Sequence, residues 1–328
     1  VAGNSPAIGN GVHSVDLVRS STLHLANGRT VPLTKPVLVY DTIRLDNRDV
    51  LQGHIVWPQS YEQSTQNLRG TRGGIVTDQT AMQANTLQVN GLLHANESGA
   101  YQTQTTVMNG GTLSSGKGST TVLQAKKLLV MQPTQRVNEE GVQETVFATV
   151  DSQGRTGIEA GVMDIQAGRI SSSSRDSKAL VLQGNEGYLR ALKKTHAIEK
   201  GTQETAEVTE ISSAGGTTLK FRKSVIGHAP HLGGENLDVI APNIQMHDVP
   251  LIRHESWEEK TGNWYNRKTK KVHKTTQTSS VPQYKGKEKI TFTGDQSHRS
   301  PQIESPQTIL TSPTGTVALK LTPQHHQE

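Results

Sequence analysis

Short strand-forming runs closed by tight turns, recurring with a period of roughly 16 to 20 residues, constrain the fold of this chain most. The turn at 89–91, Val-Asn-Gly, returns as Met-Asn-Gly at 108–110. Leu93 and Leu113 then hold matching positions after the two turns. One such unit is too small to bury its own apolar residues, so the repeat predicts units stacked at the roughly 4.8 Å spacing of neighbouring strands.

Later segments suggest the same unit length. Residues 164–168, Asp-Ile-Gln-Ala-Gly, are echoed by residues 181–185, Val-Leu-Gln-Gly-Asn, and Leu237 follows Leu219 at a similar distance. Windows with helical spacing of apolar residues are nearly missing, because Gly, Thr or Ser interrupts them. We therefore expect an all-β chain built as a solenoid.

Composition limits the core to small aliphatic side chains. Apolar residues other than Gly make up 32% of the 328 residues, and aromatic residues only 4%. A thin, repeated core fits this supply better than one large globular core. Cysteine is absent, which excludes disulfides, thiolate zinc sites and a cysteine nucleophile. The near-balance of 34 basic and 29 acidic residues does not favour a nucleic-acid partner.

Three polar, charge-rich stretches interrupt the repeat, near 131–155, 192–214 and 251–288. At or after the end of each, Gly leads into an alternating strand, which marks Ile158, Leu219 and Ile290 as equivalent inward positions. We expect each polar stretch to protrude from the stack as a β-ribbon.

The organisation that follows has five parts, and the stretches near 131–155 and 192–214 protrude from the second of them. They are a strand-rich segment without a clear period at 1–80, stacked coils at 81–250, a Trp-, Lys- and Thr-rich excursion at 251–288, resumed coils at 289–322 and a loose tail at 323–328. The first residue is Val rather than Met, and the first residues carry no signal sequence. We therefore expect a piece of a longer polypeptide.

Two segments resemble a known family. Residues 156–170, which read TGIEAGVMDIQAGRI, resemble the haemagglutinin repeats of filamentous-haemagglutinin-like exoproteins, a family that includes the stalks of contact-dependent growth inhibition effectors. Residues 256–282 are similar to the Trp-, Lys- and Thr-rich segment that precedes a Gly-led strand in this family, and Gly286 and Ile290 occupy those last places. The resemblance covers roughly 81–322.

The resemblance implies a right-handed parallel β-helix with protruding ribbons, exported to the bacterial cell surface through an outer-membrane transporter partner. It implies a non-enzymatic stalk, without a cofactor, for adhesion or contact-dependent toxin delivery. Its expected partners are a target-cell receptor or glycan and flanking coils of the same polypeptide, and no nucleic acid.

The excursion at 251–288 carries the candidate binding residues Trp257, Trp264, Tyr265 and Lys268. A basic run follows the aromatic residues, and Glu residues precede it. A solvated ribbon with cross-strand Glu and Lys pairs explains this composition, and a surface that contacts a receptor explains it as well.

Two other functions stay open: a polysaccharide-cleaving enzyme on the same fold, and a receptor- or glycan-binding module. A cleaving enzyme needs clustered carboxylates, whereas Asp151, Asp164, Asp176 and Asp238 are scattered in the repeat. His228 and His231 lack a third ligand at motif spacing, and we expect solvated turn histidines.

Overall fold

The computed structural model describes residues 19–20, 22–24, 27–32, 37–45, 48–58, 74–116, 118–137 and 140–321. Within these residues the chain forms strands and turns and no helix, which confirms the all-β class. The predicted loose tail at 323–328 lies outside the described residues.

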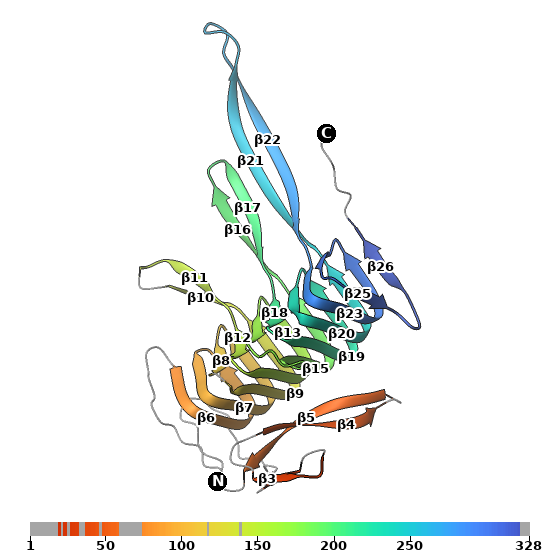
Figure 1. Ribbon diagram of the computed structural model, residues 1–328. Helices are drawn as coiled ribbons and strands as arrows, with labels where there is room; N and C mark the ends of the chain where they lie inside the picture. Colours follow the sequence, from red (N-terminus) through yellow and green to blue (C-terminus); the bar gives the residue numbers. More distant parts are fainter. Residues whose placement is uncertain are drawn as a thin grey trace.

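One large sheet, in which every strand pairing is parallel, forms the body of the molecule (Figure 1). Its fifteen strands are β6 (Gly74–Val89), β7 (Leu92–Asn109), β8 (Thr112–Ser115), β9 (Thr120–Gln132), β12 (Thr149–Ser152), β13 (Arg155–Gln166), β14 (Arg169–Ser172), β15 (Leu180–Arg190), β18 (Glu210–Ser213), β19 (Gly216–His228), β20 (His231–His247), β23 (Gln283–Arg299), β24 (Gln302–Glu304), β25 (Thr308–Thr311) and β26 (Val317–Lys320).

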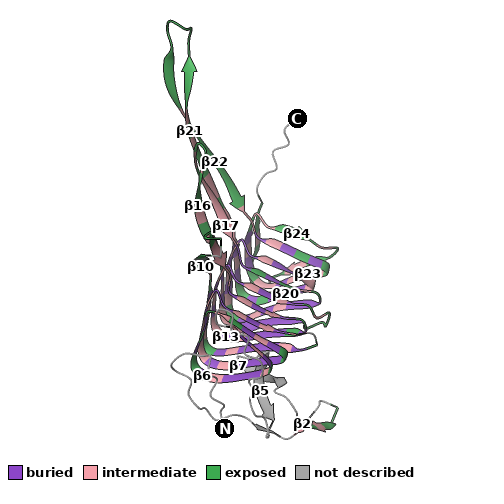
Figure 2. Cartoon of the chain, turned by 90° about the vertical axis from the view of Figure 1, so that its left-hand side faces the viewer, coloured by how far each residue is buried: buried purple, intermediate pink, exposed green. Residues whose placement is uncertain are grey.

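The parallel pairings place inward side chains in three columns, each crossing successive levels of the sheet, and all the residues named here are buried (Figure 2). The first column is Ile75, Leu93, Leu113, Val150, Ile170, Ile211, Leu232 and Tyr284. The second is Met82, Tyr101, Leu123, Ile158, Leu182, Leu219, Val239 and Phe292. The third is Val89, Met108, Met131, Ile165, Leu189, Gly227, Met246 and His298.

The observed register confirms some of the predicted spacings and corrects others. Val89 pairs with Met108 and Leu93 with Leu113, as the repeated turns predict. The predicted echo of residues 164–168 at 181–185 is wrong, because Asp164 pairs with Tyr188, farther along the chain. The loop around the Asp176 turn, between β14 and β15, lengthens this level beyond the expected period.

Two inward positions are also displaced by one inward step. Leu219 pairs with Val239 and not with Leu237. Ile158 and Leu219 share a column through Leu182, whereas Ile290 falls in the neighbouring column, opposite Leu237. The error is two residues each time, so these side chains still face inward and are buried.

Glycine returns the chain to the stack where neighbouring backbones come close. A Cβ on Gly154 would overlap the carbonyl oxygen of Ser119, and a Cβ on Gly216 would overlap that of Ser177. Both glycines begin a level immediately before or at the start of a long strand, β13 or β19. The glycines at these two re-entry points are therefore required by close backbone approach.

Hydroxyl groups form a polar edge inside the stack. Ser115 Oγ donates to Ser152 Oγ at 2.7 Å, and Ser152 Oγ donates to the carbonyl oxygen of Ser119 at 2.9 Å. Thr121 and Thr217 are fully buried and donate to the carbonyl oxygens of Asp151 and Gly233. These bonds satisfy buried hydroxyls that would otherwise destabilise the core.

Three antiparallel hairpins leave the stack, one within each predicted polar stretch (Figure 1). They are β10–β11 (Thr134–Val137 and Gln143–Val146), β16–β17 (Leu192–Ile198 and Gly201–Glu207) and β21–β22 (Val249–Thr261 and Lys268–Ser280). β23 re-enters the large sheet at Gln283, before the end of the predicted excursion at 288.

The N-terminal strands form separate small sheets. These are β1 (Arg19–Ser20), β4 (Val37–Leu45) and β5 (Arg48–Pro58) in one sheet and β2 (Thr22–His24) and β3 (Thr30–Pro32) in another. The large sheet begins with β6 at Gly74, ahead of the expected start at 81.

Candidate interaction surface

Two of the three hairpins join into one four-stranded antiparallel sheet, which we call the fin, in the order β16–β17–β21–β22. Gly201 of β17 pairs with Glu255 of β21, and Thr202 pairs with His254. The amide of Ser256 donates to the carbonyl oxygen of Lys200 at 2.7 Å. Hairpins that are distant in the sequence therefore behave as a single projecting element.

The position of Gly201 explains how β17 comes so close to β21. A Cβ at this residue would overlap the carbonyl oxygen of His254. Farther down the fin, the Glu204 side chain accepts a hydrogen bond from the amide of Ile252 at 2.8 Å. The contact between the hairpins thus includes a charge-assisted bond in addition to the backbone ladder.

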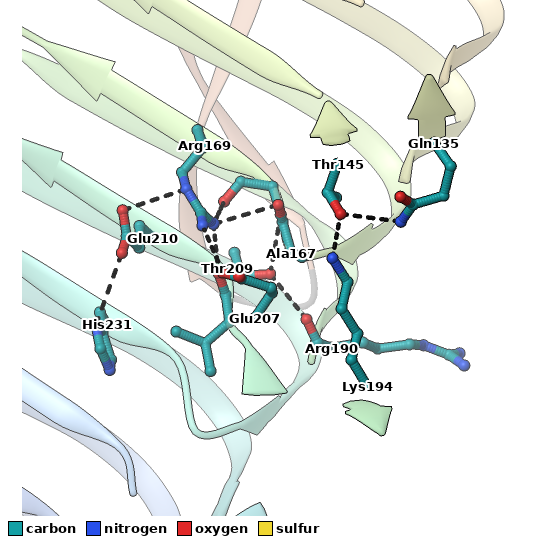
Figure 3. A network of polar contacts seen from close by, with 12 residues as sticks. Gln135, Thr145, Ala167, Arg169, Arg190, Lys194, Glu207, Thr209, Glu210 and His231 are labelled. Carbon is teal, nitrogen blue, oxygen red and sulfur yellow. Dashed lines mark hydrogen bonds and ion pairs between the residues drawn. The ribbon is translucent and has the colours of Figure 1, made fainter. Parts of the chain in front are cut away.

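Arg169 anchors the base of the fin to the stack (Figure 3). Its guanidinium donates to the carbonyl oxygen of Val208 and lies 3.5 Å from Glu207 and 3.3 Å from Glu210. The same group lies over the ring of Phe147, 4.1 Å from the centroid. One side chain therefore ties the end of β17 to the end of the first hairpin.

The first hairpin also contacts the fin directly (Figure 3). The Lys194 ammonium of β16 donates to the hydroxyl of Thr145 on β11. Thr145 in turn accepts a bond from Gln135 Nε2 at 2.9 Å. The three hairpins consequently lie in one row along the same side of the stack (Figure 2).

The outer half of β21–β22 extends beyond β17 as a two-stranded ribbon. Glu258 faces Lys271 and Glu259 faces Lys270 in register. The expected cross-strand Glu and Lys pairing is confirmed at the level of strand register. Nearly every residue of this half is exposed, so packing against other elements contributes little to its stability.

The turn of this ribbon presents two aromatic rings to solvent. Trp264 is 85% exposed and Tyr265 is 71% exposed, and their rings lie edge to face with centroids 5.6 Å apart. Asn263 Nδ2 donates to the Tyr265 hydroxyl at 3.0 Å. Lys268 lies just after the turn, opposite Thr261. Trp264, Tyr265 and Lys268 therefore form one exposed tip.

Trp257 belongs to a different part of the ribbon. It is half-buried opposite Val272, with the Lys200 ammonium 5.7 Å from its ring centroid and Glu259 Oε1 3.1 Å from Nε1. Four residue pairs separate it from Lys268, which corresponds to about 13 Å along a strand. The structure thus separates Trp257 from the other three predicted binding residues.

The histidines singled out in the sequence do not form a site together. His228 ends β19 and stacks on His247 with ring centroids 5.5 Å apart, whereas His231 begins β20 and lies 4.0 Å from Glu210. Burial lowers the pKa of both His228 and His231. The expectation of solvated turn histidines is wrong, because both are half-buried at strand ends.

The outer faces of the stack carry two grooves. One, of about 540 Å³, is lined by a row of amides from Gln83, Gln102, Gln124 and Gln183 and by one acid, Glu159. The other, of about 900 Å³, includes His231, Glu210, Lys285 and Glu304. In the described part of the chain, no group of three or more His, Asp or Glu side chains could hold a metal ion.

No protein-family model, curated protein or solved structure matches this chain. In the portion of the chain that the structure covers, no helix has the length and apolarity needed to cross a bilayer.

Proposed function

We propose that this chain is a stalk segment of a large secreted bacterial surface exoprotein, and that the fin is the part of it that contacts another surface. In this proposal the parallel sheet closes into a right-handed β-helix, and an outer-membrane transporter exports it. The segment serves adhesion or contact-dependent toxin delivery, without a cofactor or a catalytic step. A target-cell receptor or glycan, and flanking coils of the same polypeptide, are the proposed partners.

The three buried columns support the stalk. Each level contributes an inward residue to each column, and the neighbouring levels cover it on both sides. Such an arrangement gains stability from nearest-neighbour contacts, so it can be long and stiff without a large core. A rod of this kind suits a function that depends on reach.

The single observation that carries the contact function is the construction of the fin. Two hairpins from distant levels are hydrogen-bonded into one sheet, and Arg169 fixes its base, yet the far end exposes an aromatic pair. Clustered exposed aromatic side chains mark interaction sites on protein surfaces. A fin without a partner would not need such residues at its tip.

Trimming the ribbon tests the proposal. Residues 258–271 are replaced by Asn-Gly between Trp257 and Val272, which face each other in register. We expect binding of the secreted protein to target cells to fall to background. In the matched control, residues 135–145 are replaced by Asn-Gly between the paired Thr134 and Val146, and binding should persist.

Both trimmed proteins must retain the circular dichroism spectrum of the parent. Equal binding by the parent and the protein that lacks residues 258–271 would refute the fin as the contact element. Release of sugars from a panel of polysaccharides by the intact protein would instead favour the enzymatic alternative, with its active site in one of the two grooves.

A further inference from the structure

We propose that the tip of the β21–β22 ribbon binds an anionic lipid surface, with Trp264 and Tyr265 entering the headgroup region. This inference rests on the proposed contact function of the fin and names the chemistry of the surface it meets. It concerns residues 258–271 and no other part of the molecule.

The exposure of the two rings is the first argument. Their large apolar area is solvated in this structure, at 85% and 71% exposure, although both side chains carry a polar N–H or O–H. Trp and Tyr concentrate at membrane–water interfaces, because the ring is apolar and its polar group can stay hydrated. The tip therefore exposes the two residue types that this environment favours most.

Charge is the second argument. Between residues 258 and 271 the ribbon has five cations, Lys260, Arg267, Lys268, Lys270 and Lys271, against Glu258 and Glu259, a net charge of +3. Each basic side chain close to an anionic leaflet contributes roughly a fivefold gain in affinity at moderate salt. The cations flank the rings on both strands, so charge attraction and ring insertion act at the same place.

Shape favours a membrane over a protein receptor. The tip is a narrow turn, closed by a hydrogen bond from the Asn266 amide to the carbonyl oxygen of Asn263 at 2.9 Å. The residues adjoining the ring pair, Asn263 and Asn266, are polar and exposed. Protein interfaces surround their aromatic anchors with contacts that exclude water. A convex wedge with only two rings suits a deformable lipid surface better.

Rigidity brings the tip to the surface. The fin holds the ribbon at its base through Gly201, Thr202 and Gln203, and the tip is the part of the ribbon farthest from the stack (Figure 1). A flat bilayer can therefore meet the rings before it meets the stack. Little ordering is needed on binding, which limits the entropic cost.

Vesicle binding tests the inference. The full chain is sedimented with vesicles of phosphatidylcholine alone and of phosphatidylcholine mixed with phosphatidylglycerol. We expect binding to the anionic vesicles only, with loss in high salt because surface charges are screened. Trp264→Ala with Tyr265→Ala should abolish binding. Arg267→Ala with Lys268→Ala should weaken it about 25-fold. Lys178→Ala, at an exposed turn of the stack, is the control and should bind as the parent does.

Fluorescence gives an independent readout of insertion. Trp57 and Trp257 are replaced by Phe, which leaves Trp264 as the only indole in the chain. Its emission should shift to shorter wavelength with anionic vesicles and stay unchanged with neutral ones. An unshifted spectrum, or binding that survives loss of both rings, would overturn the lipid proposal.

The same variants separate this inference from the proposed function. If trimming residues 258–271 abolishes cell binding while the parent ignores vesicles, the tip binds a protein receptor or glycan and the lipid proposal is wrong. If trimming leaves cell binding intact, the contact function of the fin is wrong. Binding of the untrimmed chain to anionic vesicles, combined with loss of cell binding on trimming, supports both.

Discussion

The stack and the fin are both built from β-strands, but different forces hold them. In the stack, Leu182, Leu219 and Val239 follow one another in register and are fully buried. In the outer fin, residues at equivalent ladder positions, such as Glu258 and Lys271, are exposed. The comparison teaches that burial between levels maintains the fold, whereas the fin depends on its backbone ladder and its base. Surface residues of the fin are therefore available for contact.

A buried charge in the stack should produce the largest effect. Leu219→Asp places a carboxylate in a fully buried column, at an expected cost on the order of several kcal/mol in the free energy of unfolding. Lys220→Asp, one residue later, faces outward and should cost well under about 1 kcal/mol. Denaturant titration measures both. Equal losses would mean that the assigned register is wrong.

Acid should destabilise the stack through His298, which is fully buried. Its Nδ1 accepts from the Tyr284 hydroxyl at 2.7 Å, and its Nε2 donates to Gln296 Oε1 at 3.0 Å. Burial lowers the pKa of His298 from 6.5 to about 4. The unfolded chain therefore binds this proton first as the pH falls.

The stabilisation that neutral His298 provides is complete above pH 6.5 and is lost as the pH falls toward about 4. The loss amounts to about 3 kcal/mol. Denaturant titrations across this range should show it in the parent and much less of it in His298→Gln. His273→Gln, on the exposed ribbon, should retain the pH dependence of the parent. An identical acid response in the parent and His298→Gln would contradict the assignment.

A change at the base of the fin should have an intermediate and local effect. Arg169→Ala removes a donor to Val208 and an ion-pair partner of Glu207 and Glu210. We expect a loss of about 1–2 kcal/mol, mainly as faster amide exchange in β16 and β17. Arg155→Ala, which breaks an ion pair with Asp176, should leave that exchange unchanged. Unaltered exchange in Arg169→Ala would show that the backbone ladder alone holds the fin.

The smallest effect should come from the exposed ribbon. Glu258→Lys places a second cation opposite Lys271 in a solvated pair. We expect a change of at most about 0.5 kcal/mol in the free energy of unfolding, because solvent screens the repulsion. A loss comparable to that of Leu219→Asp would mean that the ribbon is part of the cooperative core.

The sequence predicted the stack better than it predicted the fin. Local turns such as those before Leu93 and Leu113 have similar sequences on consecutive levels, so their register can be read directly. The register of Ile290 failed by two residues, because the intervening strand pairing contains two bulges that periodicity does not reveal. Both errors kept the inward face, since side chains alternate with a period of two.

The fin could not be predicted, because its strands come from hairpins that are distant in sequence. β17 and β21 are polar along their length and show no apolar pattern that would select a partner. Gly201 was the one available signal, since a glycine in a strand often marks close approach of another backbone. Of the predicted binding residues, Trp264 and Tyr265 meet because they are adjacent in the chain, and Trp257 is separated from them by the strand.

Disulfide trapping tests most directly whether the two hairpins form one fin. The chain has no cysteine, so Thr202→Cys with His254→Cys gives a single defined pair. These residues face each other across β17 and β21, at a separation that antiparallel pairs and disulfides share. We predict rapid, nearly complete oxidation, whereas Thr202→Cys with Lys271→Cys, on a strand that does not adjoin β17, stays reduced. Failure of the first pair to form, or equal oxidation of both pairs, would contradict a joined fin.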